Sequence, residues 1–151
     1  MSYSEGLASF FFSEEKTTGY MRHKIGKGHS DFSDYTAIKT PSHKNIQWGD
    51  RPVAVLTNRM SYSATNDFVN RMKNLPNVIV VGDKTGGGGG MPISSELPNG
   101  WAVRFSASPM YNIDKEDTEF GIDPDFKVDM DITDTTSDAI IEKAMEELRK
   151  F

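Results

Sequence analysis

Ser63 is the residue of this chain whose type and position could support nucleophilic chemistry. It follows an apolar, β-prone run, residues 51–58, and precedes a segment whose apolar side chains recur at helical spacing, residues 64–74. A serine at such a junction lies at a helix N-terminus, where free backbone N–H groups and the helix dipole favour negative charge. That environment suits a serine alkoxide and a developing oxyanion. It also suits an ordinary N-cap, the commoner role of serine there, so the pattern leaves both interpretations open.

A few other side chains could in principle take a proton from a serine. Lys84 comes directly after a second apolar run, residues 77–83, and the histidines are His23, His29 and His43. Imidazole and amine groups act as general bases when they lie within hydrogen-bonding reach of the nucleophile. Nothing in the spacing of the three histidines places one of them beside Ser63.

Five consecutive glycines, residues 86–90, follow Lys84-Thr85. A phosphate-binding loop has its lysine after the glycines, so this order argues against a nucleotide site. The run predicts either a flexible turn or a bare backbone against which a peptide can lie closely, because glycine has no Cβ. Residues 129–134 begin like a calcium loop but lack the glycine and the glutamate that such a loop requires. We therefore expect no metal and no cofactor.

The elements that must position these residues follow from the periodicity. Strands at 52–58 and 77–83 flank a helix at 64–74, and this β-α-β order predicts a parallel pair with a right-handed crossover. Asn99-Gly100 lies between two β-prone segments and is typical of a type I′ hairpin turn. The hairpin strands are predicted at 94–98 and 101–108, and further strands at 19–25 and 35–39, with a loop at 26–31.

Two more helices are predicted near the ends of the chain. Residues 5–15 form the first, and its aromatic cluster, residues 10–12, is expected to pack on a sheet. Thr135 or Thr136 is expected to cap the last helix. The predicted apolar face of that helix comprises Ile140, Ile141, Ala144, Met145 and Leu148.

Composition limits the class of protein. The chain has 151 residues, of which 36% are hydrophobic, and a net charge of −5, so nothing indicates a nucleic-acid partner. It has no cysteine, which excludes disulfides and thiolate metal sites. No apolar run approaches the roughly 20 residues of a membrane span. The mean hydropathy of −0.52 is low for a complete globular domain.

Four motifs occur in an order that resembles the C-terminal-processing, or tail-specific, serine protease family. In that family a nucleophile turn opens a helix, and a glycine-ended strand, a Pro-x-Gly hairpin and a Gly-x-x-Pro-Asp segment follow. The resemblance covers about residues 51–128, and it implies a Clp-protease/crotonase-like α/β fold and hydrolysis of peptide bonds with Ser63 as the nucleophile. The matching segments are Ser63-Ala64-Thr65-Asn66, Val80-Val81-Gly82-Asp83-Lys84-Thr85, Leu97-Pro98-Asn99-Gly100-Trp101 and Gly121-Ile122-Asp123-Pro124-Asp125.

The chain departs from the better-known members of this family, which use a serine–lysine dyad. The position of the dyad lysine falls at Gly88 and that of an accessory glutamine at Pro92. The chain is more similar to the tricorn-protease and retinoid-binding-protein branch, where glycines replace the lysine segment. In tricorn-like enzymes an upstream histidine serves the serine, together with a glutamate just before the Gly-x-x-Pro-Asp motif. The resemblance places Glu119 near that glutamate.

The resemblance completes a candidate site. The Ala64 N–H, directly after the nucleophile, is expected to donate to the oxyanion. Gly87 and Gly88 are expected to contribute to oxyanion or substrate binding through their backbone, and Glu119 is expected to orient the base.

The remaining expectations concern the protein as a whole. The chain looks like the C-terminal part of a catalytic domain, and without an upstream base and oxyanion donor it is expected to be inactive alone. The resemblance implies a peptide or unfolded protein as substrate and an extracytoplasmic location in a bacterium. An exposed edge could allow self-association. The alternative is a non-catalytic peptide- or ligand-binding module on the same fold.

Overall fold

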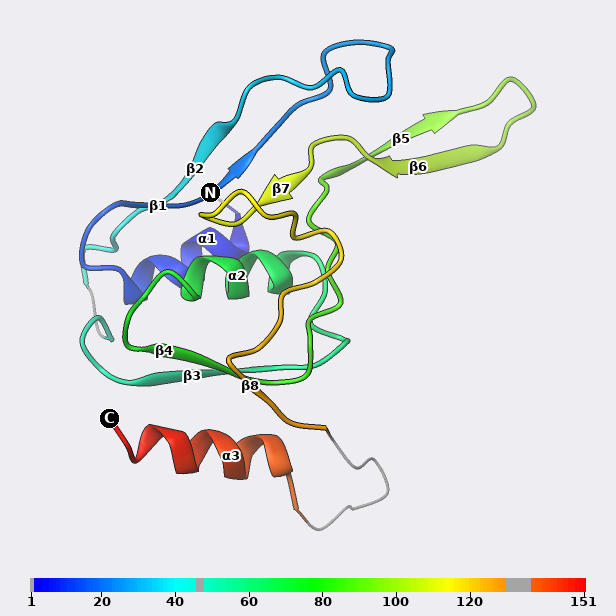
Figure 1. Ribbon diagram of the computed structural model, residues 1–151. Helices are drawn as coiled ribbons and strands as arrows, with labels where there is room; N and C mark the ends of the chain where they lie inside the picture. The colour runs from blue at the N-terminus through cyan, green and yellow to red at the C-terminus, as the bar shows by residue number, and fades with distance from the viewer. Residues whose placement is uncertain (1, 46–47, 130–136) are drawn as a thin grey trace.

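The structure is a computed structural model that describes residues 2–45, 48–129 and 137–151. These residues form a mixed α/β arrangement of three small sheets and several short helices (Figure 1). The elements are α1 (Tyr3–Ala8), a 3₁₀ turn η1 (Ser9–Phe11), β1 (Lys16–Met21), β2 (Thr36–Thr40), β3 (Val53–Thr57), α2 (Ala64–Met72), β4 (Val78–Gly82), β5 (Pro92–Glu96), β6 (Ala102–Ser106), β7 (Met110–Tyr111), β8 (Phe126–Lys127) and α3 (Ala139–Leu148).

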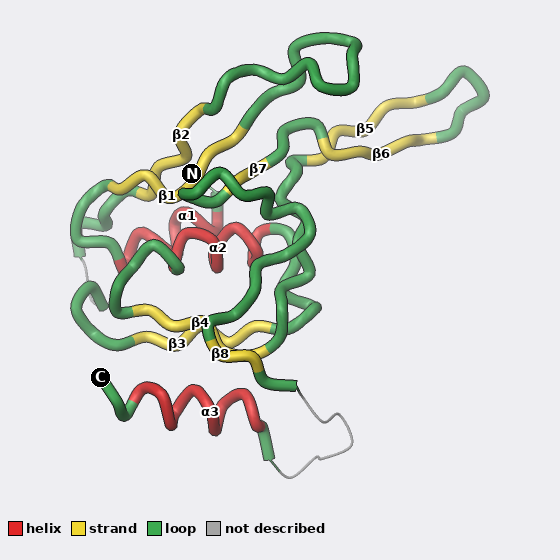
Figure 2. The backbone as a smooth tube through the Cα atoms, viewed as in Figure 1, coloured by secondary structure: helices red, strands yellow, loops and turns green. Residues whose placement is uncertain are grey.

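The predicted β-α-β unit is confirmed. Strands β3 and β4 pair in parallel, from Val53 opposite Val78 to Thr57 opposite Gly82, and α2 connects them. Strand β8 adds to the other edge of β4, also in parallel. The carboxyl ends of β3 and β4 therefore lie at the same end of the sheet, and the chain leaves both strands there as loops (Figure 2). In open α/β sheets this end is where ligands usually bind.

The central sheet is covered on both faces. Val78 packs with Ala8, Phe12 and Met72 on the side of α1 and α2, whereas Ile79 and Val81 pack with residues of α3 on the other side. All five residues of β4 are buried, as expected for a strand covered on both faces. Figure 1 shows the same layers. Helix α3 lies below the sheet β3–β4–β8, and helices α1 and α2 lie between that sheet and the sheet β2–β1–β7.

The first helix is shorter than predicted, but its aromatic cluster packs as expected. The α-helix ends at Ala8, a 3₁₀ turn follows to Phe11, and Phe12 has an extended backbone. Phe12 is fully buried, while Phe10 stacks on His43 with ring centroids 4.1 Å apart. The predicted helix over 5–15 was wrong in extent because β1 begins at Lys16 and requires an extended approach.

The predicted hairpin is confirmed, but its turn type was wrong. Strands β5 and β6 pair from Pro92 opposite Ser106 to Glu96 opposite Ala102, and the hairpin projects from the body of the molecule (Figure 1). Leu97 N–H donates to Trp101 O at 2.7 Å, and only Gly100 within the turn has a positive φ, of 84°. In a two-residue type I′ hairpin Trp101 N–H would donate to Pro98 O and Pro98 would donate in return, but proline has no N–H for the second bond. The pairing therefore moves out to Leu97, with glycine in the left-handed position.

The remaining elements differ from the sequence predictions mainly at their boundaries. Strand β1 lies at Lys16–Met21 rather than 19–25, so His23 is outside it, whereas β2 at Thr36–Thr40 lies within one residue of its prediction. The cap of α3 is Asp138, whose Oδ1 accepts from Ile140 and Ile141 N–H at 3.0 and 3.1 Å. The caps predicted at 135–136 lie outside the described residues.

The apolar face of α3 is narrower than predicted. Ile140 and Ala144 are buried against the sheet, and Leu148 packs beside them. Ile141 and Met145 are each 49% exposed. In the part of the chain that the structure covers, no helix combines the length and apolar composition needed to cross a bilayer.

Candidate active site

Ser63 lies in the turn between β3 and α2, and its backbone is strained. Its φ of 59° and ψ of −116° are unusual for a residue that carries a Cβ. It occupies the N-cap position of α2, yet its side chain makes no capping hydrogen bond. Ser63 is exposed, and its hydroxyl is not used for capping. The strained backbone of Ser63 persists only because the surrounding structure enforces it.

Ser61 has a different role in the same turn. It is 9% exposed, its Oγ accepts from Asn58 N–H at 3.2 Å, and its own N–H donates to Asn58 O at 2.9 Å. Its carbonyl accepts from Gly86 N–H at 3.0 Å. Ser61 therefore fastens the turn, while Ser63 presents its side chain to solvent.

The glycine loop joins the Ser63 turn to the segment that carries Glu119. Ser63 N–H donates to Gly87 O at 2.8 Å, and Gly88 N–H donates to Glu119 O at 2.9 Å. A Cβ on Gly87 would lie 2.0 Å from Glu119 O, and a Cβ on Gly88 would lie 2.5 Å from the Tyr62 ring. Both glycines have φ near +80°, at 82° and 81°. Close packing therefore explains these two glycines, which the sequence patterns could assign only to flexibility or to substrate contact.

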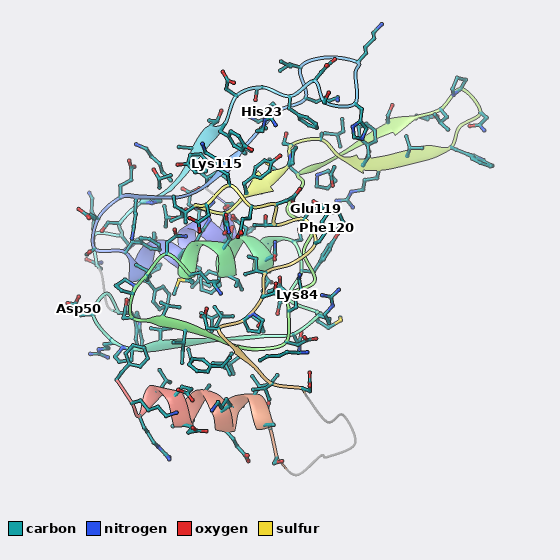
Figure 3. All side chains as sticks on the ribbon, viewed as in Figure 1. His23, Asp50, Lys84, Lys115, Glu119 and Phe120 are labelled. Atoms are coloured by element: carbon teal, nitrogen blue, oxygen red, sulfur yellow. The ribbon has the colours of Figure 1, made fainter. Side chains whose placement is uncertain are left out.

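Glu119 has two carboxylate oxygens in different environments. Oε1 accepts from the Ser106 hydroxyl at 3.1 Å, whereas Oε2 is buried and has no hydrogen-bond partner among the described residues. Burying a carboxylate oxygen without a donor is unfavourable, so such an atom indicates a missing partner. Figure 3 shows Glu119 near the base of the β5–β6 hairpin.

Ser63 and Glu119 line one pocket of about 300 Å³. The structure thus brings together two residues that the sequence analysis selected from distant segments. The glycine loop and the β5–β6 hairpin form the other walls of this pocket. The remaining lining residues are Tyr62, Gly88, Gly90, Pro92, Arg104, Phe105 and Ser106.

A larger groove of about 770 Å³ is also lined by Ser63, together with Ala64. Its lining is largely apolar, and half-buried Asp67 forms an ion pair of 2.9 Å with buried Arg71 beside it. Apolar lining with a few polar groups is the usual character of a ligand-binding groove. The apolar lining residues are Met21, Ala37, Ile38, Ala64, Met91, Pro92, Ile93 and Met110.

The three predicted backbone contributors differ in availability. Ala64 is exposed, and within the described ranges its N–H has no hydrogen-bond acceptor. The Gly88 N–H is engaged with Glu119, although Gly88 lines both cavities. Gly87 is buried and lines neither. The roles of all three in oxyanion or substrate binding stay predictions.

The histidine side chains and Lys84 lie away from the Ser63 pocket, and Lys39, which lines the larger groove, is paired with Glu15 at 2.8 Å. Lys84 pairs with Asp123 at 3.3 Å and lines a separate pocket, and Figure 3 shows it well apart from Glu119. The His23 Nδ1 lies 3.1 Å from the Ser108 hydroxyl, and His43 stacks on Phe10. None of the histidines, His29 included, lines either cavity that contains Ser63.

Sequence reasoning missed Ser106 and Arg104. Both lie on β6, two residues apart, and therefore on the same face of the hairpin. That alternation was visible in the sequence, but nothing indicated which face would meet Glu119. Among the described residues there is also no cluster of three or more histidine, aspartate or glutamate side chains suited to a metal ion. Most of the aspartate-rich segment at 129–134 lies outside those residues.

Comparisons with known proteins identify the family of the chain. The model of peptidase family S41 matches residues 1–128. The chain therefore belongs to peptidase family S41, which confirms the resemblance to the C-terminal-processing proteases at the level of the family. No curated protein matches the chain.

Solved structures extend the comparison. A candidate peptidase from Parabacteroides merdae is 53% identical, with a TM-score of 0.91, over 97% of this chain and 47% of its own. Mature CPAF complexed with lactacystin is 15% identical, with a TM-score of 0.74, over 98% of this chain and 40% of its own. The photosystem II D1 C-terminal processing protease is 18% identical, with a TM-score of 0.60, over 83% of this chain and 30% of its own. The last two show the fold alone, and the chain spans about half the length of the Parabacteroides protein.

Proposed function

We propose that this chain is part of a serine-type peptidase of the tail-specific, tricorn-like kind, which hydrolyses peptide bonds of protein substrates. The observation that carries the proposal is the state of Ser63. Its hydroxyl is free of capping, in a strained turn at a helix N-terminus, and it shares a pocket with Glu119. Family membership supports a peptidase independently.

In this mechanism Ser63 Oγ attacks the scissile carbonyl carbon. The Ala64 N–H stabilises the oxyanion, because it is unpaired and follows the nucleophile directly. A base takes the proton of Ser63 and later gives it to the leaving amine. The unpartnered Oε2 of Glu119 accepts a hydrogen bond from that base and holds its orientation.

We assign the base to a segment outside this chain. His23, His29, His43 and Lys84 all lie outside the two cavities that contain Ser63. The fold of the full protein is then Clp-protease/crotonase-like, with this chain as one part of the catalytic domain. An extracytoplasmic location and a peptide or unfolded protein substrate belong to the same proposal.

A fluorophosphonate probe on the full-length protein tests the proposal directly. We expect covalent labelling at Ser63, with labelling lost in Ser63→Ala and retained in Ser61→Ala. Labelling that survives Ser63→Ala, or that depends on Ser61, would contradict the assignment.

The second candidate is a non-catalytic module that binds a peptide or a small ligand. It is favoured by the apolar groove of about 770 Å³ and by the glycine at the family's lysine position. A folded full-length protein that binds peptides but gives no labelling at Ser63 would support this second function.

A further inference from the structure

The two carboxylate oxygens of Glu119 are not equivalent, because Ser106 donates a hydrogen bond to only one of them. The Ser106 hydroxyl donates to Oε1 at 3.1 Å, while the buried Oε2 has no partner among the residues that the structure describes. A glutamate side chain has three rotatable bonds, so a carboxylate without such a donor samples several orientations. The hydrogen bond from Ser106 selects one of them.

Ser106 is itself held firmly at the base of the hairpin. It is the last residue of β6, and the next two residues, Ala107 and Ser108, both donate their N–H to Gly90 O, at 3.0 and 3.1 Å. These bonds tie the end of β6 to the glycine loop. The hairpin base is therefore part of the site, although the hairpin itself extends into solvent (Figure 1).

Gly90 lies close to both Ser106 and Glu119. A Cβ at this position would lie 2.3 Å from the Ser106 Oγ and 2.6 Å from the Glu119 Oε2. Its φ is not in the left-handed region, so alanine is acceptable to the backbone and only the contacts exclude it. The absence of a side chain at Gly90 thus allows Ser106 and Glu119 to approach each other.

We propose that Ser106 is a positioning residue, which fixes the Glu119 carboxylate through Oε1 so that Oε2 faces the base that serves Ser63. This role rests on the proposed peptidase function and deepens it. Ser106 touches neither the substrate carbonyl nor the proton that Ser63 loses. It acts through Glu119 alone, and this restriction makes the proposal testable.

The test is a double-mutant cycle on the full-length protein with a peptide substrate. Ser106→Ala should lower kcat about 10- to 100-fold, the value of one hydrogen bond to a charged group, and leave KM within about twofold. Ser106→Thr keeps the hydroxyl and should restore most of kcat. In the Glu119→Gln background Ser106→Ala should cause no further loss, because the two residues act as one unit.

Two further variants separate positioning from folding. Gly90→Ala should lower kcat to a similar extent by displacing Ser106 and Glu119. Ser94→Ala is the matched control, since Ser94 lies on β5 of the same hairpin but lines neither cavity, and it should keep wild-type kcat.

The outcomes distinguish this inference from the proposed function. If Ser63→Ala abolishes turnover but Ser106→Ala does not lower kcat, the role of Ser106 is wrong and the peptidase function stands. Independent effects of Ser106→Ala and Glu119→Gln that multiply would also overturn it. If turnover is absent or does not need Ser63, both the peptidase function and the role of Ser106 are refuted.

Discussion

Ser63 donates its backbone N–H to the carbonyl of Gly87 at 2.8 Å, and this bond fixes the strained turn to the glycine loop. The next residue of the loop, Gly88, donates to the carbonyl of Glu119. Two adjacent glycines thus connect the backbone of the proposed nucleophile with the backbone of Glu119, whose carboxylate is proposed to orient the base. The geometry of the site depends on the backbone of this loop.

This relationship predicts that Gly87 cannot carry a side chain. Gly87→Ala should lower the melting temperature by several degrees and abolish probe labelling of Ser63, because its Cβ would lie 2.0 Å from Glu119 O. Gly100→Ala is the matched control, since Gly100 has nearly the same φ, 84° against 82°, but nothing within 4 Å of an added Cβ. Equal losses in both variants would mean that φ strain, and not the contact with Glu119, requires the glycine.

Ser63 and Ser61 should respond to substitution in opposite ways. In the full-length protein Ser63→Ala should abolish turnover with little change in melting temperature, since the side chain makes no capping bond. Ser61→Ala should retain turnover but cost about 1–3 kcal/mol of stability, because it leaves Asn58 N–H without its acceptor. Peptide hydrolysis and thermal unfolding measure the two effects, and the reverse pattern would place the nucleophile at Ser61.

Lys84 should not be the general base. It pairs with Asp123 at 3.3 Å and lies outside the Ser63 pocket. Lys84→Ala in the full-length protein should change kcat by less than about tenfold, well below the 10²–10⁴-fold loss usual for a general base. A larger loss in a variant that still folds would overturn the tricorn-like assignment.

The packing of α3 should depend on pH through Glu147. Hydrogen bonds from Lys143 and Lys150, at 2.8 and 2.7 Å, hold the pKa of Glu147 below its ordinary value of 4.5. A folded-state pKa that is lowered contributes stability above the unfolded value, and this contribution is lost as the pH falls through the folded value. The melting temperature of Glu147→Gln should therefore lie below wild type at pH 7 and approach it near pH 3.

The matched control for this prediction is Glu142→Gln on the same helix. Glu142 is exposed and forms no ion pair with any described residue. Its substitution should leave the pH dependence of the melting temperature unchanged. A constant difference between wild type and Glu147→Gln from pH 7 to pH 3 would show that the ion pairs do not stabilise the helix.

The 151-residue chain alone should show no peptidase activity above background. Serine is a poor nucleophile near neutral pH without a base. No described histidine lines the Ser63 cavities, and Lys39, the one described lysine that does, is paired with Glu15 at 2.8 Å. Peptide hydrolysis by the purified chain, compared with its Ser63→Ala variant, measures this. Cleavage that depends on Ser63 would require a base within the chain, with His23 the first to test.

The same chain is expected to self-associate through the β5–β6 hairpin. Ile93, Val103 and Phe105 alternate with polar residues on one face of the hairpin and are 37–50% exposed, and Trp101 beyond them is 71% exposed. Sedimentation velocity should show dimers or larger species that Phe105→Ser reduces. A wild-type chain that remains monomeric at high concentration would contradict this.

The sequence by itself determined the β-α-β unit, the hairpin and the strand-to-helix position of Ser63. These features depend on local periodicity and on residues with strong backbone preferences, which act over a few positions. The continuous apolar run of β4 and the helical spacing after Ser63 were sufficient for the order of elements. The motifs around them were sufficient for the family.

Only the tertiary structure decided how the site is assembled. The contacts of Ser106 and Gly90 with Glu119, and of Gly88 with Tyr62, join segments that no local pattern relates. The turn at Asn99-Gly100 was predicted wrongly because a proline outside the two central residues moved the pairing, and the cap of α3 was misplaced because several polar residues precede that helix. Contacts between distant segments depend on how sheets and loops pack. That packing is determined by residues throughout the chain, and no single motif specifies it.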